Sequence, residues 1–234
     1  MFDDLVELAG LPAGGRILEI GPGTGKATLP LARRGFRLVS VELGARLAEA
    51  AKRNLAEFPG IEIVNANFET WEPDEGGFDA VVAFTAFHWI DPELRFEKPA
   101  RLLGDGGALA VVETQHVLLP DGDRFFVDVQ EDYEAVDPSE DNRPPGPPEG
   151  VPGLSGEIDA SGYFRTVGVR RHVWDVSYSA DEYIAVLDTY SGHRSLEESK
   201  RRDLYDRIRR RIESRPEGRI RKTYLAALTV ARKK

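Results

Sequence analysis

A glycine-rich turn between a short apolar run and a helical pattern is the feature of this sequence best suited to chemistry. Residues 17–25 read Ile-Leu-Glu-Ile-Gly-Pro-Gly-Thr-Gly, and Lys26 follows. A strand that leads into such a turn presents free backbone N–H groups and the positive end of a helix to a ligand. Gly21, Gly23 and Gly25 allow the backbone to approach that ligand closely. The turn therefore predicts a site for a nucleotide-like ligand.

The spacing of the glycines separates three classes of nucleotide site. A dinucleotide fingerprint needs a glycine at position 26, which is Lys26. A phosphate-binding loop ending at Gly25-Lys26 would need glycine at Ile20 and a hydroxyl residue at Ala27. The remaining pattern is E-x-G-x-G-x-G, which begins at Glu19. An acidic side chain at this position favours a cationic ligand over a pyrophosphate.

With this motif, the sequence resembles the class I S-adenosylmethionine-dependent methyltransferases. The resemblance implies that the glycine loop carries the methionine half of S-adenosyl-L-methionine, close to Glu19. It implies that Glu42, at the end of the second strand, accepts hydrogen bonds from both ribose hydroxyls and that Leu43 adjoins it. A carboxylate offers paired acceptors to a cis-diol. Asn67 stands where the family commonly has an aspartate that accepts the adenine amino group, and Phe68 packs either on the ring or in the core.

The segment after the fourth predicted strand, Phe-Thr-Ala-Phe-His-Trp-Ile-Asp at 84–91, resembles the type 11 group of that family, which includes trans-aconitate methyltransferases. The resemblance implies that this segment lies beside the sulfonium, so we expect Thr85 to contact the cofactor. His88 is either a base for an acceptor hydroxyl or a histidine bonded to the backbone at a helix start. The other expected pocket residues, each with packing as the alternative, are Phe87, Trp89, Tyr190 and His193.

The elements that must position these residues alternate between strand and helix up to residue 113. This alternation is typical of a doubly wound, mostly parallel sheet with helices on both faces. The predicted strands are 16–20, 36–41, 61–65, 78–84 and 106–112, and the predicted helices are 26–34, 45–58 and one that begins at Asp91-Pro92. With the family resemblance, the prediction is a seven-stranded Rossmann-like methyltransferase fold whose late strand is antiparallel. The cofactor should then lie across the carboxyl ends of the first strands.

After residue 113 the alternation ends. Residues 121–136 predict an acidic helix, 143–153 a proline-rich loop, 164–177 one or two strands, 180–190 and 196–212 helices, and 219–230 a last strand. We therefore expect a cofactor-binding core at 1–113, with 114–234 completing the same fold. Helices within about 114–155 and 178–214 should form a cap over the acceptor.

Composition narrows the functional class. The chain has 234 residues, a formal net charge of −9 and no cysteine, so it can hold neither a disulfide nor a thiolate metal site. The histidines lack the spacing of metal ligands, and we expect no metal. No apolar run approaches the roughly 18 residues of a membrane span, and the first ten residues do not resemble a signal peptide. We expect a cytoplasmic protein, monomeric or homodimeric.

The charge is uneven along the chain. Residues 200–234 hold 14 Lys and Arg against 4 Asp and Glu. This could form a nucleic-acid patch, but Leu204, Ile208 and Ile212 predict an amphipathic helix with an arginine-rich solvent face. The acidic remainder of the chain would repel phosphates, so we expect no nucleic-acid partner.

The predicted activity is transfer of a methyl group from S-adenosyl-L-methionine to an O, N or C nucleophile of a small molecule, an enzyme of class EC 2.1.1. S-adenosyl-L-homocysteine would be the product, and a carboxylate or hydroxyl could be the acceptor. Two alternatives stay open. One is an NAD(P)-dependent oxidoreductase, which Lys26 disfavours, and the other is a member of the family that binds the cofactor without catalysis.

Overall fold

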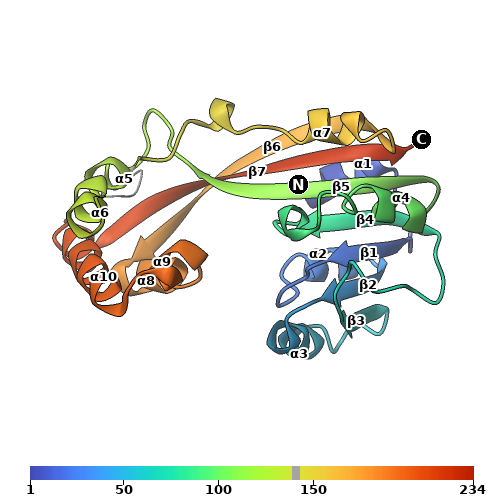
Figure 1. Ribbon diagram of the computed structural model, residues 1–234, viewed down its shortest axis with the longest axis horizontal. Coiled ribbons are helices and arrows are strands. Elements are labelled where there is room, and N and C mark those ends of the chain that lie inside the picture. The colour runs from blue at the N-terminus through green and yellow to red at the C-terminus, as the bar shows by residue number, and fades with distance from the viewer. Residues whose placement is uncertain (139–142) are drawn as a thin grey trace. The chain divides into compact units, whose positions relative to one another are not determined.

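The structure is a computed structural model, and it describes residues 1–138 and 143–234. Residues 139–142, which fall within the expected cap segment 114–155, lie outside the described residues. Figure 1 shows the order of the elements along the chain. They are α1 (Phe2–Ala9), β1 (Arg16–Ile20), α2 (Thr28–Ala32), β2 (Arg37–Glu42), α3 (Ala45–Asn54), β3 (Ile61–Asn65), β4 (Phe78–Phe84), η1 (Phe87–Trp89), α4 (Glu97–Leu102), β5 (Leu103–Val117), α5 (Phe125–Asp128), α6 (Gln130–Val136), η2 (Pro148–Gly150), α7 (Ser155–Ala160), β6 (Phe164–Ser179), α8 (Ala180–Leu187), α9 (Ser191–Ser195), α10 (Glu198–Glu213) and β7 (Arg219–Lys233).

The strands form one seven-stranded sheet in the order β3-β2-β1-β4-β5-β7-β6. Neighbouring strands from β1 to β5 are parallel. The end of β7 lies against the starts of β5 and β6, because Lys233 Nζ donates to the Leu103 carbonyl and the Lys234 N–H donates to the Tyr163 carbonyl. β7 therefore runs antiparallel to both neighbours, as the arrows in Figure 1 show. The predicted mostly parallel, doubly wound sheet is confirmed.

The described chain folds into two compact units. Unit 1 comprises Met1–Thr114, Gly153–His172 and Ala226–Lys234, and unit 2 comprises Gln115–Pro152 and Val173–Leu225. The strands β5, β6 and β7 each contribute residues to both units. The chain returns to unit 1 twice after Thr114. The expected core at 1–113, with 114–234 completing the same fold, stays a prediction.

The core of unit 1 lies on both faces of its part of the sheet. Side chains alternate between the faces of a strand, so Ile17 joins one apolar cluster and Leu18 the other. Leu5 of α1 and Leu31 of α2 cover the Ile17 face, and Ile158 of α7 belongs to the cluster on the Leu18 face. Burial on both faces explains why β4 is apolar from Ala80 to Phe84, as expected for the centre of a parallel sheet.

The parallel register brings the carboxyl ends of four strands to one edge of unit 1. Ile20 of β1 is paired with Val41 of β2 and with Ala83 of β4, and Glu42 is paired with Asn65 of β3. The segments that follow these strands therefore meet at this edge. It is the edge at which doubly wound sheets bind their ligands.

Several element boundaries differ from the sequence predictions. The helix predicted to begin at Asp91-Pro92 begins instead at Glu97, because Asp91 Oδ1 accepts the Glu93 N–H at 2.8 Å and its carbonyl accepts the Leu94 and Arg95 N–H groups, which forms a turn. The acidic helix predicted at 121–136 is divided into α5 and α6 at Val129. The last strands are longer than predicted, and the sequence analysis missed α1, α7 and α9.

Candidate functional site

A pocket of about 340 Å³ lies in unit 1 at the carboxyl ends of the parallel strands. Its walls come from the glycine turn after β1, the end of β2 with the start of α3, the segment after β3 and the segment after β4. The lining residues are Ile20, Gly21, Gly23, Val41, Glu42, Leu43, Leu47, Asn67, Phe68, Glu69, Thr85, Ala86, Trp89 and Ile90. The pocket thus gathers residues from four segments that are separate in the sequence.

The three glycines of the turn have different structural roles. All three have a positive φ, which other residues adopt only with strain. A Cβ on Gly21 would lie 2.7 Å from the Ala86 Cβ, and one on Gly25 would lie 2.8 Å from Leu55 Cδ1. A Cβ on Gly23 would meet no atom within 4 Å. Gly21 and Gly23 line the pocket, whereas the lining does not include Gly25, which allows close packing against Leu55.

Glu42 is the acidic residue most firmly fixed at the pocket. Its Oε2 accepts the Gly23 N–H at 2.9 Å, and its Oε1 accepts the Gly44 N–H at 2.7 Å. The residue is only 7% exposed, yet it lines the pocket. Two backbone amides therefore hold the carboxylate in place, and each oxygen keeps a further lone pair for a ligand donor.

Glu19 lies on β1, next to the pocket residue Ile20, and is itself buried at 1% exposure. Its Oε2 accepts the Thr28 hydroxyl at 2.7 Å and the Ser40 hydroxyl at 2.9 Å. Its Oε1 is buried and has no partner among the described residues. Burial raises the pKa of the Glu19 carboxyl to about 7, against the effect of the two hydroxyls. The carboxyl therefore lacks one hydrogen-bond partner, which a cationic ligand group could supply.

The segment after β3 forms a third wall of the pocket. Asn67 is exposed, and its Oδ1 accepts the Glu69 N–H at 2.9 Å. Phe68 is buried at 6% exposure in the core and also lines the pocket, and its packing on the adenine ring stays a prediction. Glu69 Oε1 accepts the Asp91 N–H at 2.9 Å, which joins this wall to the segment after β4.

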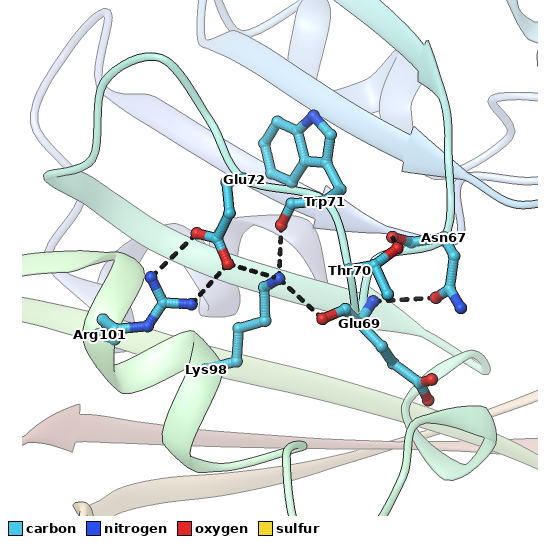
Figure 2. Close-up of polar contacts among 7 residues, drawn as sticks. All are labelled: Asn67, Glu69, Thr70, Trp71, Glu72, Lys98 and Arg101. Atoms are coloured by element: carbon cyan, nitrogen blue, oxygen red, sulfur yellow. Dashed lines mark hydrogen bonds and ion pairs between the residues drawn. The ribbon is translucent and has the colours of Figure 1, made fainter.

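A buried lysine of α4, Lys98, binds the segment after β3. Figure 2 shows Lys98 Nζ directed at the carbonyls of Glu69 and Trp71 and at the carboxylate of Glu72. Lys98 is 3% exposed, and its Nζ lies 5.3 Å from the ring centroid of Phe68. Arg101 makes two further hydrogen bonds to Glu72, at 2.8 and 2.9 Å. Arg101 first, and Lys98 second, lower the pKa of Glu72 to about 2.

The segment after β4 carries the predicted residues around the sulfonium. Thr85 lines the pocket and is the one non-glycine residue with positive φ in the described part of the chain, at 55°. Such strain in a β-branched residue is typical of functional sites. Trp89 lines the pocket with 75% exposure. Phe87 takes the packing alternative, because it is 1% exposed and its ring lies 5.5 Å from that of Phe96.

His88 lies on η1 and is exposed, so burial does not fix it as a packing residue. Its ring lies 4.9 Å from that of Trp89, which lines the pocket. The charge of His88 also acts on Glu113 of β5, whose pKa is raised, chiefly by burial. Glu113 is a titratable neighbour of His88 that the sequence analysis did not identify.

Two of the predicted pocket residues, Tyr190 and His193, belong to unit 2. Tyr190 Oη accepts a hydrogen bond from Lys222 Nζ at 2.9 Å, and His193 Nε2 lies 2.9 Å from Tyr133 Oη. Burial lowers the pKa of His193. Their place in a substrate pocket stays a prediction.

The sequence analysis missed part of the pocket lining. Leu47 is the clearest example, because it is an apolar side chain on the first turn of α3 that remains 44% exposed beside the pocket. Its position five residues after Glu42 was the available signal. Glu69 was also missed, and its acidic type two residues after Asn67 could have suggested it.

The pocket residues fit a cationic nucleoside better than a phosphate ligand. Glu42 and Glu69 are its ionisable lining residues, and no Lys or Arg lines it in the described part of the chain. The space beside Gly23 and the unpartnered oxygen of Glu19 are compatible with a ligand that carries a donor group. Within the described residues, no group of three or more His, Asp or Glu side chains could hold a metal ion. None of the described helices is long and apolar enough to cross a membrane.

Comparison with known proteins relates this region to methyltransferases. Residues 17–107 match the family described as a methyltransferase domain. An uncharacterized methyltransferase of Mycobacterium tuberculosis (strain ATCC 25618 / H37Rv) is 34% identical over 103 residues, which are 44% of this chain and 41% of that protein. The chain thus spans about two fifths of the length of the curated relatives it matches first.

Two solved structures resemble the chain over nearly its whole length. A proposed type II methyltransferase of Anaeromyxobacter dehalogenans matches with a TM-score of 0.66 and 21% identity, covering 98% of this chain and 95% of that one. Geranyl diphosphate C-methyltransferase of Streptomyces coelicolor A3(2), solved in complex with Mg²⁺, geranyl-S-thiolodiphosphate and S-adenosyl-L-homocysteine, matches with a TM-score of 0.54 and 14% identity, covering 99% and 74%. At these identities the likeness shows the fold. The predicted resemblance to trans-aconitate methyltransferases stays a prediction.

Proposed function

We propose that residues 17–107, which match the methyltransferase domain family, form a domain of the class I, S-adenosylmethionine-dependent type, and that the protein transfers a methyl group from S-adenosyl-L-methionine to a small molecule. The single observation that carries this proposal is the geometry of Glu42 at the pocket. Two backbone amides orient its carboxylate, and its remaining lone pairs suit the two hydroxyls of a ribose.

The charge of the pocket supports a sulfonium nucleoside over a dinucleotide. Among the described residues, no Lys or Arg lines the pocket to pair with a pyrophosphate. The carboxylates of Glu42 and Glu69 attract a cationic ligand. This argument weakens the NAD(P)-dependent alternative independently of Lys26.

Each wall of the pocket has a proposed role in holding the cofactor. Gly21 and Gly23 offer the backbone of the glycine turn, and Glu19, next to the pocket residue Ile20, supplies its unpartnered oxygen. Glu42 and Leu43 hold the ribose side, while Asn67 and Phe68 border the base. Thr85 lies at the segment next to the reacting group. Gly25 acts indirectly, by allowing the turn to pack against Leu55.

The bound cofactor supplies an activated methyl group on a sulfonium, so the protein needs mainly to orient the acceptor and exclude water. The exposed ring of Trp89 beside the pocket would shield this region from solvent. We assign His88 as the proton acceptor for a hydroxyl acceptor. A carboxylate acceptor is already ionised and would need no base.

Calorimetric titration of the protein with S-adenosyl-L-homocysteine and, separately, with NADH tests the cofactor assignment. We expect S-adenosyl-L-homocysteine to bind and NADH to give no heat of binding. Binding of NADH alone would identify the oxidoreductase alternative.

A turnover assay tests catalysis. Mass spectrometry would follow the formation of S-adenosyl-L-homocysteine from S-adenosyl-L-methionine with a panel of carboxylic and phenolic acceptors. If no acceptor gave S-adenosyl-L-homocysteine, the protein would be a non-catalytic cofactor-binding protein.

The role of His88 is tested in the same turnover assay once an acceptor is found. With a hydroxyl acceptor, His88→Ala should slow turnover about 10²-fold or more while leaving affinity for S-adenosyl-L-homocysteine unchanged. Equal rates for the two proteins would remove His88 from the mechanism.

A further inference from the structure

Unit 2 contains a buried lysine surrounded by tyrosine rings. Lys222 lies on β7 and is 1% exposed. Its Nζ donates to Tyr190 Oη at 2.9 Å. The same nitrogen lies 5.1 Å from the ring centroids of Tyr190 and Tyr224 and 5.5 Å from that of Tyr183. The ammonium group is therefore enclosed by neutral aromatic side chains, all within unit 2.

Lys222 has no carboxylate partner among the described residues. Burial of an unpaired ammonium is costly, and cation–π contacts of this kind recover only about 0.5–2 kcal/mol each. An ammonium can donate three hydrogen bonds, and Tyr190 accepts one of them. Two donors of a buried cation thus have no partner among the described residues.

Lys98 in unit 1 shows what a buried lysine with a structural role looks like in the same chain. Its exposure of 3% is similar, but it donates to two backbone carbonyls and to the carboxylate of Glu72 (Figure 2). Its charge and its three donors are satisfied by the protein. Lys222 has only one such hydrogen bond, so this contrast indicates that its burial does not serve to stabilise the fold.

His116 provides a second unsatisfied polar group near Lys222. Its Nε2 is buried and has no hydrogen-bond partner in the described part of the chain. Its ring lies 6.3 Å from that of Tyr224, and the charge of Lys222 acts on it. Burial lowers the pKa of His116 to about 3, so the imidazole is neutral at pH 7. Burial also lowers the pKa of Lys222 to about 8, which leaves most of the lysine protonated at pH 7.

We propose that Lys222, with His116 and the rings of Tyr183, Tyr190 and Tyr224, forms a binding site for a small organic acid whose carboxylate pairs with the Lys222 ammonium. A carboxylate would supply the missing counter-charge and accept the two free donors. The surrounding rings suit an apolar or aromatic body attached to that carboxylate. The site lies within unit 2 and does not depend on the proposed methyl transfer.

Calorimetric titration at pH 7 with three probes tests the ligand class. Benzoate carries a carboxylate on an aromatic body, benzamide is its uncharged counterpart, and inorganic phosphate is an anion without an apolar body. We expect benzoate to bind at least about tenfold more tightly than the other two. Benzamide binding as tightly as benzoate, phosphate binding as tightly as benzoate, or no binding of benzoate up to about 10 mM would each overturn the proposal.

A variant comparison assigns the binding to Lys222. Lys222→Met keeps a similar volume and removes the charge, so we expect benzoate affinity to fall by at least about tenfold. Unchanged benzoate affinity would show that Lys222 does not hold the ligand. Trp174, whose ring is stacked on that of Tyr224 at 5.5 Å, offers an optical readout of the same binding.

Thermal unfolding without any ligand separates a binding role from a structural one. If Lys222 is an uncompensated buried charge, Lys222→Met should unfold at a temperature no lower than the unsubstituted protein does. Lys98→Met is the matched control and should unfold at a lower temperature, because the Glu69 and Trp71 carbonyls lose their lysine donor and Glu72 keeps only Arg101. A Lys222→Met protein that fails to fold, or that loses as much stability as Lys98→Met, would show that Lys222 is structural and would overturn the proposal.

Discussion

The carboxylate of Glu42 has two tasks, which the structure shows to be compatible. It accepts the N–H groups of Gly23 and Gly44 with different oxygens, and it still lines the pocket. The first task fixes the glycine turn relative to β2, and the second leaves an oriented pair of acceptors for a ligand. A carboxylate that is already oriented loses little conformational entropy when the ligand binds.

Glu42→Gln should weaken the binding of S-adenosyl-L-homocysteine by about tenfold to a hundredfold, since it replaces one charge-assisted acceptor with a donor. Calorimetry measures the change. Glu69→Gln is the matched control, because Glu69 also lines the pocket and its Oε1 accepts a backbone N–H. We expect the Glu69 variant to bind with nearly unchanged affinity, and equal loss in both variants would refute a specific role for Glu42.

The protonation of Glu19 should make stability depend on pH. In the unfolded chain the carboxyl loses its proton near the ordinary glutamate pKa of 4.5, whereas burial in the folded protein raises that pKa to about 7. Between these values the folded state binds more protons, so the contribution of Glu19 to the free energy of unfolding falls as pH rises from about 4.5 to 7, by about 3 kcal/mol at most.

Glu19→Gln removes this titration while keeping the size of the side chain. Urea unfolding of both proteins at several pH values between 5 and 8 isolates the effect, because other groups cancel in the difference. We expect the unsubstituted protein to lose stability relative to Glu19→Gln as pH rises through this range. Parallel pH profiles would contradict the assigned cause.

At the scale of elements, the wall after β3 depends on α4. Lys98 of α4 binds the carbonyls of Glu69 and Trp71, and the lining residues Asn67, Phe68 and Glu69 belong to the same segment (Figure 2). The position of this wall is therefore set by a helix some 30 residues further along the chain.

Lys98→Met should lower the free energy of unfolding by about 2–4 kcal/mol, because buried acceptors lose their donor. It should also weaken the binding of S-adenosyl-L-homocysteine through the displaced wall. Arg101→Met is the matched control: the pair of Arg101 and Glu72 is about half exposed, so its loss should cost under about 1 kcal/mol. Similar stability and cofactor affinity for the two variants would show that Lys98 does not position the wall.

These elements also show what the sequence could and could not predict. Apolar periodicity located the parallel strands, and the spacing of the glycines with Glu42 located most of the pocket edge, because both patterns are local. The contact of Lys98 with the Glu69 carbonyl is not local, and a lysine in an otherwise ordinary segment carries no signal of it. The burial of Phe87 likewise depends on Phe96, which the structure alone brings into contact.

At the scale of the whole molecule, the helical interpretation of the basic segment is confirmed. Leu204, Ile208 and Ile212 form the buried stripe of α10. Several of its arginines contact carboxylates of unit 2, as in the pairs of Arg211 with Asp132 and of Arg209 with Asp181. Such pairing accounts for much of the positive charge without a nucleic acid, whose absence as a partner stays a prediction.

The division into two units was the feature least accessible from the sequence. The single division predicted at residue 113 follows the loss of strand–helix alternation, but composition does not reveal that Gly153–His172 and Ala226–Lys234 return to unit 1. Long strands such as β6 cross from one unit to the other without interruption. A change of unit within one strand leaves no pattern of glycine, proline or polarity to detect.

A crystal structure of the protein soaked with S-adenosyl-L-homocysteine tests the assignment of the pocket most directly. We expect density for the ribose within hydrogen-bonding distance of both Glu42 oxygens, with the amino acid end over the backbone of Gly21 and Gly23. Density for the nucleoside at any other place, or a Glu42 side chain rotated away from the sugar, would contradict the assignment.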